Sequence, residues 1–316
     1  MDLIHCKDIS DNPYRTKHNL TEQELKIRKK CIAEYTLIEQ NEVLPPPYTW
    51  YSDQIAGHNI NVIKDGKCQI GIIKKDDSKI LKLRMPFERG DCEVWFYSMI
   101  QKASTSLNQI DKLEAAFKDL VEWVPKYYGL ETLLLSGIDR QFLVMEDLLA
   151  SYQQPCLIDV KMGKVSFDPH ATEQKKTQEL SKSAYQQASG FRVLGYRVHK
   201  NGQVESRDRV WGKTLNQDSI TEGFKSFLSS DRSDKSATKG LLSKIRLLEK
   251  HFQTHSQLQF YASSILLIYE GDQALPTNEQ LKMIDFSHVF QIPNTADLNY
   301  IPGLQTLTDI FVNITR

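Results

Sequence analysis

The run from Pro155 to Lys164 sets residues that could do chemistry into an apolar segment typical of a buried strand. Asp159, Lys161 and Gly163 alternate along it, and alternate residues of a strand share one face. An acid beside an ammonium group can orient a hydroxyl and bind a phosphate. A structural ion pair is the alternative, but burying such a pair in a strand adds little stability. We therefore favour a catalytic role for this run.

Phosphoryl transfer needs a cation on the moving phosphate, a carboxylate that holds the metal ion, and a group that orients the attacking hydroxyl. Lys82, in the predicted strand 80–83, provides the cation if it pairs with Glu93, which lies in a predicted helix. On pattern alone, a solvated strand lysine is the commoner case. Asp285 directly follows the apolar strand 281–284, where it could give Mg²⁺ a hard oxygen ligand or cap the next turn.

Two further features are candidates for binding. The apolar strand 142–145 ends in Glu146, Asp147 and Leu148. This pattern suits either a hinge that holds adenine through backbone groups or an ordinary strand end. The second feature is His288, which on its own is typical of a core or turn histidine.

A predicted polar helix from about residue 172 to 187 carries Lys175, Gln178 and Lys182 at positions i, i+3 and i+7. This spacing places them on one helical face, where three donors could clamp the phosphates of a small ligand. The alternative is a solvated helix face, because runs of charged residues usually face the solvent. The position of the helix, directly after the run with Asp159, favours the binding role.

Composition excludes several classes of protein. Lys and Arg number 40 and Asp and Glu 40, so the chain lacks the basic excess of proteins that coat nucleic acid or anionic membranes. The five cysteines form no CxxC pair, which argues for a reducing compartment and against a zinc module. The sequence shows no apolar signal-peptide region, no apolar run of about 20 residues and no P-loop motif.

The elements that must position these residues form a β-rich first half and a mixed second half, an α+β pattern. It suits a two-lobed nucleotide kinase better than one doubly wound sheet, because strands and helices do not alternate regularly. The expected strands are short runs within 62–83 (with a hairpin turn at 75–78), then 133–135, 142–145, 156–160, 191–198, 260–269 and 281–284. The expected helices are 20–41 (with a Thr21–Glu24 capping box), 91–102, 111–121, 172–187, 220–228, 239–252 and one from about 302, with a polar loop at 229–239.

The same residues resemble the inositol phosphate kinase family, and within it the multikinases. Pro155, Asp159, Lys161 and Gly163 match the PxxxDxKxG element of that family, which is highly specific. Segments 260–271 and 283–290 are similar to its Ser-Ser-Leu-Leu-x-x-Tyr-x-Gly strand and its Ile-Asp-Phe-Ala-His segment. The likeness to multikinases rests on Gln54–His58, Pro125–Gly129, Lys164–Pro169 and Phe191–Gly195, and the resemblance covers roughly Gln54 to the C-terminus.

The resemblance implies an α+β, two-lobed protein-kinase-like fold with a short helical inositol-binding segment. Residues 1–49 would be an N-terminal helical extension and 50–147 a β-rich N-lobe with the ATP phosphates and the hinge. Residues 148–316 would form a C-lobe that contains the inositol-binding helix at 171–188. The activity implied is transfer of the γ-phosphate of ATP to hydroxyls of inositol tris- and tetrakisphosphates, with Mg²⁺ as the metal ion.

The resemblance also implies roles for single residues. ATP would contact Lys82 at its phosphates, Glu146, Asp147 and Leu148 at adenine, and Asp159 at the ribose. Asp285 would be a further ATP-binding residue. Asp159, Lys161 and Asp285 would be catalytic, with Asp159 at the accepting hydroxyl and Asp285 holding Mg²⁺. The substrate-binding side chains would be Arg89, Lys161, Lys175, Gln178, Lys182 and His288. Glu179 departs from the pattern, since some multikinases carry an amide there, and its carboxylate could repel a ring phosphate.

Other functions compete with this interpretation. An inositol hexakisphosphate kinase that makes pyrophosphates shares the core motif, and a non-catalytic scaffold is a second alternative. A protein kinase is disfavoured because the H-R-D-x-x-x-x-N loop is missing. The expected partners are inositol phosphates and ATP, with no nucleic acid and no stable membrane association, although a phosphoinositide headgroup is a further candidate ligand. A monomer in the nucleus and cytoplasm is the remaining expectation.

Overall fold

The computed structural model describes residues 21–55, 60–106, 111–183, 185–200, 202–254, 257–292 and 295–316. These residues form two compact units. The first contains the described residues up to 106 together with 125–150, and the second contains 111–124 and the described residues from 151 to 316. Part of the run Gln54–His58 and part of the expected extension 1–49 lie outside the described residues.

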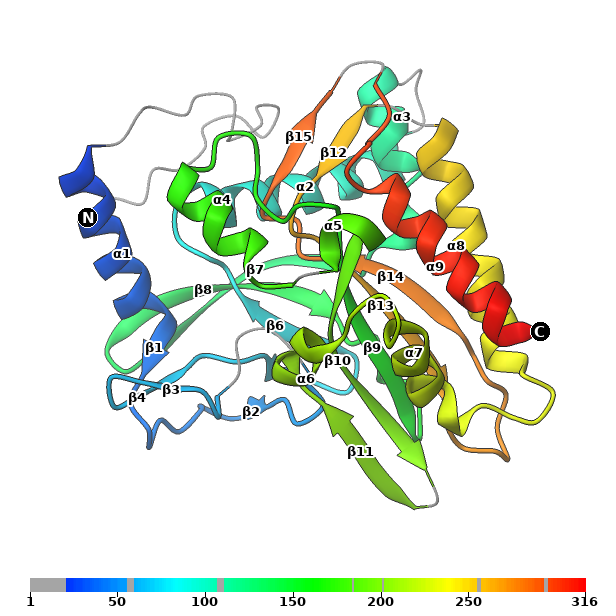
Figure 1. Ribbon diagram of the computed structural model, residues 1–316. Coiled ribbons are helices and arrows are strands. Elements are labelled where there is room, and N and C mark those ends of the chain that lie inside the picture. The colour runs from blue at the N-terminus through cyan, green and yellow to red at the C-terminus, as the bar shows by residue number, and fades with distance from the viewer. Residues whose placement is uncertain are drawn as a thin grey trace. The chain divides into compact units, whose positions relative to one another are not determined.

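The first unit is built on a five-stranded antiparallel sheet (Figure 1). Its strands, in order across the sheet, are β2 (Thr49–Trp50), β5 (Ile73–Lys74), β6 (Lys79–Leu83), β8 (Ile138–Glu146) and β7 (Tyr127–Leu135). Leu81, Leu83, Phe142 and Val144 point into a buried apolar cluster on one face. Because side chains alternate along a strand, Lys82 points to the opposite face. A three-stranded sheet of β1 (Leu37–Ile38), β4 (Lys67–Gln69) and β3 (Ile63–Lys64) completes this part.

Helix α1 (Glu22–Thr36) begins at the predicted capping box but ends earlier than the predicted Asn41, because β1 follows directly. The buried Arg140 binds its last turn. The Arg140 guanidinium donates hydrogen bonds to the carbonyls of Glu34 (3.2 Å), Tyr35 (2.8 Å) and Leu37 (2.8 Å). A cation at the carbonyl end of a helix is favourable. Arg140 therefore holds this helix to the rest of the first unit.

The second unit contains a five-stranded antiparallel sheet with one apolar face and one polar face. Its strands, in order, are β11 (Gln203–Arg207), β10 (Phe191–Lys200), β9 (Pro155–Met162), β13 (Ser264–Glu270) and β14 (Gln280–Ile284). Ile158, Val160 and Met162 of the central strand are fully or almost fully buried on the apolar face. The residues between them, Asp159 and Lys161, point to the other face.

Three helices cover the apolar face: α7 (Ile220–Phe227), α8 (Ser236–Thr254) and α9 (Ile301–Thr315). Phe224 of α7 packs edge-on against Phe191 of β10, with ring centroids 6.0 Å apart. Gly303 of α9 lies so close to Met162 that a Cβ there would be 2.8 Å from the Met162 Cε. Helices α8 and α9 run side by side (Figure 1). Further elements of this unit are α3 (Lys112–Lys118), η2 (Val121–Trp123), α6 (Arg209–Thr214) and β12 (Leu258–Phe260) paired with β15 (Val289–Gln291).

Three further predicted elements differ from the structure. The helix expected at 172–187 is broken into α4 (Glu173–Leu180) and α5 (Gln186–Ser189). The strand expected at 260–269 is divided between β12 and β13, because Ala262 turns the chain with a φ of +55°. The polar stretch 229–239 is no open loop. It holds η3 (Leu228–Ser230) and the start of α8, whose first-turn amides donate to the carboxylate of Asp231.

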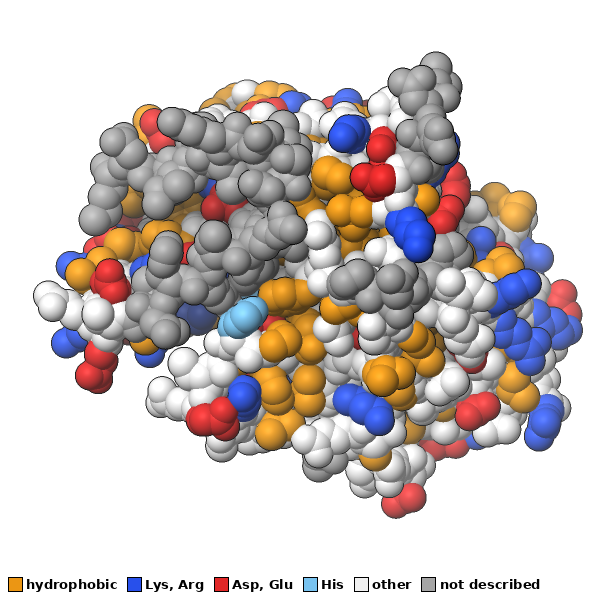
Figure 2. Space-filling view, turned by 90° about the horizontal axis from the view of Figure 1, so that it is seen from above, with side chains coloured by type: hydrophobic (Ala, Val, Ile, Leu, Met, Phe, Trp, Pro, Cys, Tyr) orange, Lys and Arg blue, Asp and Glu red, His pale blue; other side chains and the backbone are white. Residues whose placement is uncertain are grey.

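The helix expected at 91–102 and the hairpin around 75–78 are present, as α2 (Glu88–Thr105) and as β5 with β6. Figure 2 shows Lys and Arg side chains interspersed with Asp and Glu on the face drawn there, in keeping with the zero net charge of the chain. In the part of the chain that the structure describes, no helix is long and apolar enough to cross a bilayer.

Asp297 holds the loop before α9 against β12. Its Oδ2 accepts a hydrogen bond from the Phe260 amide (2.8 Å), and its Oδ1 accepts from the amides of Asn299 (2.9 Å) and Tyr300 (3.1 Å). The side chain is only 1% exposed. This carboxylate therefore fixes the chain directly before the turn at Ala262.

We expect Asp297→Asn to lower the free energy of unfolding by about 1–3 kcal/mol, because an amide nitrogen would face a backbone N–H in a buried site. Urea unfolding measures the change. Asp309→Asn, an exposed position on α9, should stay within about 0.5 kcal/mol of the parent chain. Equal stability of the two variants would contradict this anchoring role.

Candidate active site

Asp159 and Lys161 lie on the polar face of β9, as the sequence predicts. Lys161 is opposite Arg192 of β10 and Ser264 of β13, so that all three side chains share this face. Gly163, expected on the same strand face, instead follows the end of β9. Its φ is +103°, and a Cβ there would lie 2.4 Å from Nδ2 of Asn299. Glycine is therefore needed at this position for the turn.

The ammonium group of Lys161 is held in place by a backbone carbonyl and feels the charge of two acids. Its Nζ donates a hydrogen bond of 2.7 Å to the carbonyl of Ala262, in the turn between β12 and β13. Burial lowers the pKa of Lys161 below its ordinary value, while the carboxylates of Asp285 and Asp159 act in the opposite direction. Both acids are thus near enough to act on this lysine. The structure brings together all three residues that the sequence predicts to be catalytic.

Asp285 follows directly after β14, with a φ of +67°. Such a backbone is uncommon outside glycine, although Asp tolerates it better than most residues, and strained residues of this kind often occur at active sites. The carboxylate offers the hard oxygens that Mg²⁺ prefers. Among the described residues no group of three His, Cys, Asp or Glu side chains could hold a metal. This donor set fits a magnesium ion whose other ligands are phosphates and water, the usual arrangement with nucleotides.

A cluster of three cations surrounds the carboxylate of Glu179, near the end of α4. Glu179 Oε1 accepts from Lys175 Nζ at 2.6 Å and from Lys182 Nζ at 2.7 Å. Arg192 Nη2 lies 3.7 Å from Oε2. Burial opposes ionisation of Glu179, but the hydrogen bonds and charges of the two lysines outweigh it and lower the pKa of Glu179 to about 2. We call Glu179, Lys175, Lys182 and Arg192 the Glu179 cluster.

The structure thus brings Lys175 and Lys182 together, although Lys182 lies beyond the end of α4. Gln178, predicted on the same face, is exposed on α4. Arg192 was not singled out from the sequence, because only the pairing of β10 with β9 reveals it as a neighbour of Lys161. The role of Glu179 had a readable signal: it stands four residues after Lys175 and three before Lys182, the spacing of helical ion pairs.

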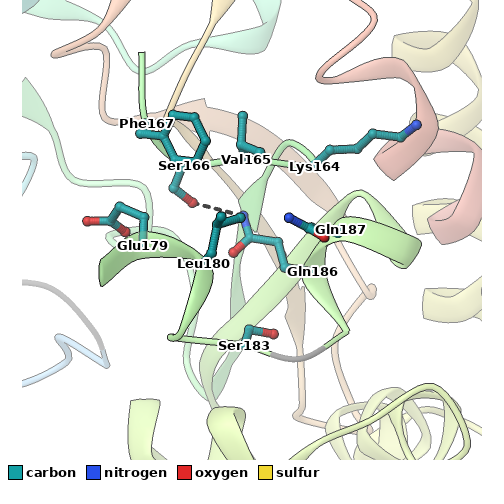
Figure 3. A pocket seen from close by; sticks show the side chains of 9 residues that line it. All are labelled: Lys164, Val165, Ser166, Phe167, Glu179, Leu180, Ser183, Gln186 and Gln187. Atoms are coloured by element: carbon teal, nitrogen blue, oxygen red, sulfur yellow. Dashed lines mark hydrogen bonds between the residues drawn. The ribbon is translucent and has the colours of Figure 1, made fainter. Parts of the chain in front are cut away.

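A small pocket beside α4 and α5 is lined by polar groups that support the Glu179 cluster (Figure 3). Gln186 Nε2 donates to Ser166 Oγ at 2.8 Å and to the carbonyl of Gly163 at 2.9 Å. The Oε1 of the same amide accepts from Arg192 Nη1 at 3.2 Å. Figure 3 shows Gln186 and Ser166 joined by their hydrogen bond, with Glu179 on the neighbouring helix. Gln186 thereby ties the turn after β9 to Arg192.

His288 is paired with a buried acid. Its Nδ1 lies 2.9 Å from Oδ2 of Asp168, whose Oδ1 accepts a hydrogen bond from the backbone of His170. Asp168 therefore fixes the orientation of the imidazole ring. The His288 side chain is partly exposed, and its substrate-binding role stays a prediction.

In the first unit, the predicted pair of Lys82 and Glu93 is present. Lys82 Nζ lies 2.6 Å from Glu93 Oε1, and the Glu93 side chain is 1% exposed while that of Lys82 is 30% exposed. The carboxylate on α2 therefore holds the ammonium group at the surface of the sheet, as in the kinase device for fixing a cation on ATP phosphates. Arg89 is exposed in the first turn of α2.

The segment predicted as a hinge ends β8. The Asp147 carboxylate accepts hydrogen bonds from the hydroxyl of Tyr51 (2.7 Å) and the amide of Leu149 (3.0 Å). The Glu146 carboxylate accepts from the amide of Lys126 (3.1 Å). Both acidic side chains thus have internal partners, and the backbone amides of Glu146 and Asp147 donate to the carbonyls of Lys126 (2.9 Å) and Ser78 (2.8 Å). Binding of adenine by Glu146 to Leu148 stays a prediction.

Comparison with known proteins agrees with this geometry. The family model described as inositol polyphosphate kinase matches residues 142–312. The inositol polyphosphate multikinase of Homo sapiens is 32% identical over 264 residues, which cover 81% of this chain and 60% of that protein. Inositol polyphosphate multikinase alpha of Arabidopsis thaliana is 28% identical over 287 residues, which cover 83% of this chain and 93% of that protein. The chain spans only 55–60% of the length of the mammalian relatives that it matches.

Solved structures show the same fold. The inositol phosphate multikinase Ipk2 of S. cerevisiae, determined in complex with ADP and Mn²⁺, has a TM-score of 0.62 and 22% identity, covering 76% of this chain and 100% of that one. A second multikinase structure has a TM-score of 0.56 and 27% identity, covering 70% of this chain and 99% of that one. The expected α+β kinase-like fold is thereby confirmed.

The family match takes in more than half of the chain, and it includes the strand with Asp159 and Lys161, the Glu179 cluster, and β14 with Asp285 directly after it. This chain therefore belongs to the inositol polyphosphate kinase family.

Proposed function

We propose that this chain transfers the γ-phosphate of ATP to hydroxyls of inositol tris- and tetrakisphosphates, as an inositol polyphosphate multikinase. The observation that carries the proposal is the grouping of Asp159, Lys161 and Asp285 around one polar strand face. Family membership and the multikinase relatives support it. The ADP and Mn²⁺ bound in the yeast relative support the use of a nucleotide and a divalent metal ion.

Each side chain has one task in this proposal. Asp159 accepts the hydrogen bond of the attacking hydroxyl and so directs its oxygen at the γ-phosphorus. The new oxygen–phosphorus bond forms as the bond to the β–γ bridging oxygen breaks, the proton of the hydroxyl passes to Asp159, and ADP leaves. Lys161 and Lys82 bind phosphate oxygens whose charge grows during the transfer. A Mg²⁺ ion on Asp285 would neutralise further phosphate charge.

The inositol phosphate is held by basic and polar side chains that are not consumed in the reaction. Lys175, Lys182 and Arg192 supply charge for ring phosphates, and His288 offers a ring nitrogen to a hydroxyl or phosphate. Arg89 and Gln178 complete the proposed set. Positioning of this kind converts a reaction between two molecules into one within a complex, which accounts for a large part of catalysis. The nuclear and cytoplasmic location and the monomeric state stay predictions.

We expect the purified chain, given Mg-ATP, to phosphorylate inositol tris- and tetrakisphosphates and to release one ADP per phosphate transferred. Chromatography that resolves ring isomers identifies the products. Chelation of divalent metal with EDTA should abolish the reaction. Products from inositol hexakisphosphate alone would contradict the proposal in favour of a pyrophosphate-forming kinase, and a chain without product from any inositol phosphate would favour the scaffold alternative.

Asp159→Asn and Lys161→Ala should each lower kcat by about a hundredfold or more, because removal of a positioned proton acceptor or cation usually costs that much. Circular dichroism and Tm should stay near those of the parent chain. The exposed variants Asp218→Asn and Lys200→Ala carry the same chemical changes elsewhere in this unit and should keep full activity. Full activity of either site variant would reject the assignment of these residues.

Glu93→Gln should lower kcat/KM for ATP about ten- to hundredfold, because a hydrogen bond to a charged partner contributes about 1.5–3 kcal/mol. The KM for the inositol phosphate should change little. Steady-state kinetics with each substrate varied in turn measure the effect, and Glu22→Gln on α1, which is exposed, is the control. An unchanged kcat/KM for ATP would show that Lys82 needs no partner to act.

A further inference from the structure

The Glu179 cluster has an arrangement that a simple phosphate site would lack: an anion at its centre. The buried carboxylate is 7% exposed, while the side chains of Lys175 and Lys182 are 52% and 34% exposed. Both ammonium groups bind the same oxygen of Glu179, at 2.6 and 2.7 Å. The two lysines therefore converge on this carboxylate in the way they would converge on an oxygen of a bound phosphate.

The Glu179 cluster interacts electrostatically with Lys161 on β9. Arg192, which reaches Glu179 from β10, stands opposite Lys161. The charges of Arg192 and Glu179 both act on the pKa of Lys161, in opposite directions. A phosphate bound at Lys175 and Lys182 would accordingly lie close to Glu179. The proposed reacting residues Asp159 and Lys161 lie on β9, which pairs with the strand of Arg192. Gln186 fixes Arg192 from the other side, with a hydrogen bond of 3.2 Å.

A purely structural role explains the buried carboxylate of Glu179 less well. The control pair on the same helix, Lys176 with Glu173, has its carboxylate 88% exposed, and such surface pairs contribute little. Glu179 is buried, ionised and shared among three cations, which lowers the net charge of the cluster from three to two. A carboxylate in this position does not repel a neutral hydroxyl group of a ligand, but it repels the negative charge of each additional phosphate group.

We propose that Glu179 is a specificity-determining residue, which makes this enzyme discriminate against inositol phosphates with the most phosphates in favour of those with fewer. The inference rests on the proposed function and extends it to the choice of substrate. One unit charge about 6 Å away in water-screened surroundings changes binding by roughly threefold. A phosphate carries close to two charges at neutral pH, so that removal of the Glu179 charge should favour a more phosphorylated substrate by about three- to tenfold.

The test compares the parent chain with Glu179→Gln and with Glu173→Gln, the matched loss of an exposed carboxylate on α4. For each protein, kcat/KM is measured for an inositol tetrakisphosphate and an inositol trisphosphate, and the ratio of the two values is the readout. Glu179→Gln should raise this ratio about three- to tenfold, whereas Glu173→Gln should leave it within about twofold. A ratio that Glu179→Gln leaves unchanged, or an equal loss for both substrates, overturns the proposal.

Lys175→Met provides a sign test that does not remove a buried group. It deletes a cation from the same carboxylate, so that the ratio should fall about threefold. Because Lys175 is half exposed, this variant should fold even if Glu179→Gln does not. A ratio that rises or stays constant in Lys175→Met overturns the proposal. A parent chain that phosphorylates no inositol phosphate refutes the proposed function itself, which separates the two failures.

Discussion

The second unit depends on a balance of charge on one face of its central sheet. Lys161 stands on a strand whose other face is the apolar core, and a lone ammonium group there would be costly to keep charged. The carboxylates of Asp285 and Asp159 act on it electrostatically, and the Ala262 carbonyl accepts a hydrogen bond from it. The sheet can carry a charged face because Asp159, Asp285 and the Ala262 carbonyl together stabilise the ammonium group of Lys161.

This balance explains why unusual backbone lies next to the charged residues. Ala262 and Asp285 both have positive φ values, and both belong to segments that meet Lys161. Conformations of this kind cost about 1–3 kcal/mol each. They persist because Asp297 and Asn299 hold the adjoining chain with hydrogen bonds to Phe260, Val165 and the loop before α9. The core of the unit thus supports the geometry of the site.

Local patterns in the sequence were enough to find the parts of the site that depend on one strand or one helix. The alternation of Asp159 and Lys161 fixed their common face, and the strand lysine with a helical acid predicted the pair of Lys82 and Glu93. Contacts between distant segments were beyond this reasoning. Arg192 becomes a neighbour of Lys161 only through the register of β10, which shifts at a bulge between Val193 and Gly195.

Polar runs were the other source of error. The stretch 229–239 has the composition of a loop, yet it contains the start of α8, where the Asp231 carboxylate accepts a hydrogen bond from the first turn. Conversely, the helix expected at 172–187 stops at Leu180. Composition shows that a segment is solvated, but hydrogen bonds decide whether it is helical. The two-lobed α+β class was predictable because it rests on the order of strands and helices along the whole chain, which such local errors do not alter.

The burial of Arg140 has a consequence for attempts to express a minimal kinase. This guanidinium is completely enclosed and gives its hydrogen bonds to the carbonyl end of α1. A fragment that starts at residue 50 would keep every proposed catalytic residue, yet Arg140 would lose the carbonyls of Glu34, Tyr35 and Leu37 and keep only those of Leu135 and Ile138 as acceptors. The boundary of the proposed catalytic part and the boundary of the folded unit therefore differ, and the helix at residues 22–36 lies inside the latter.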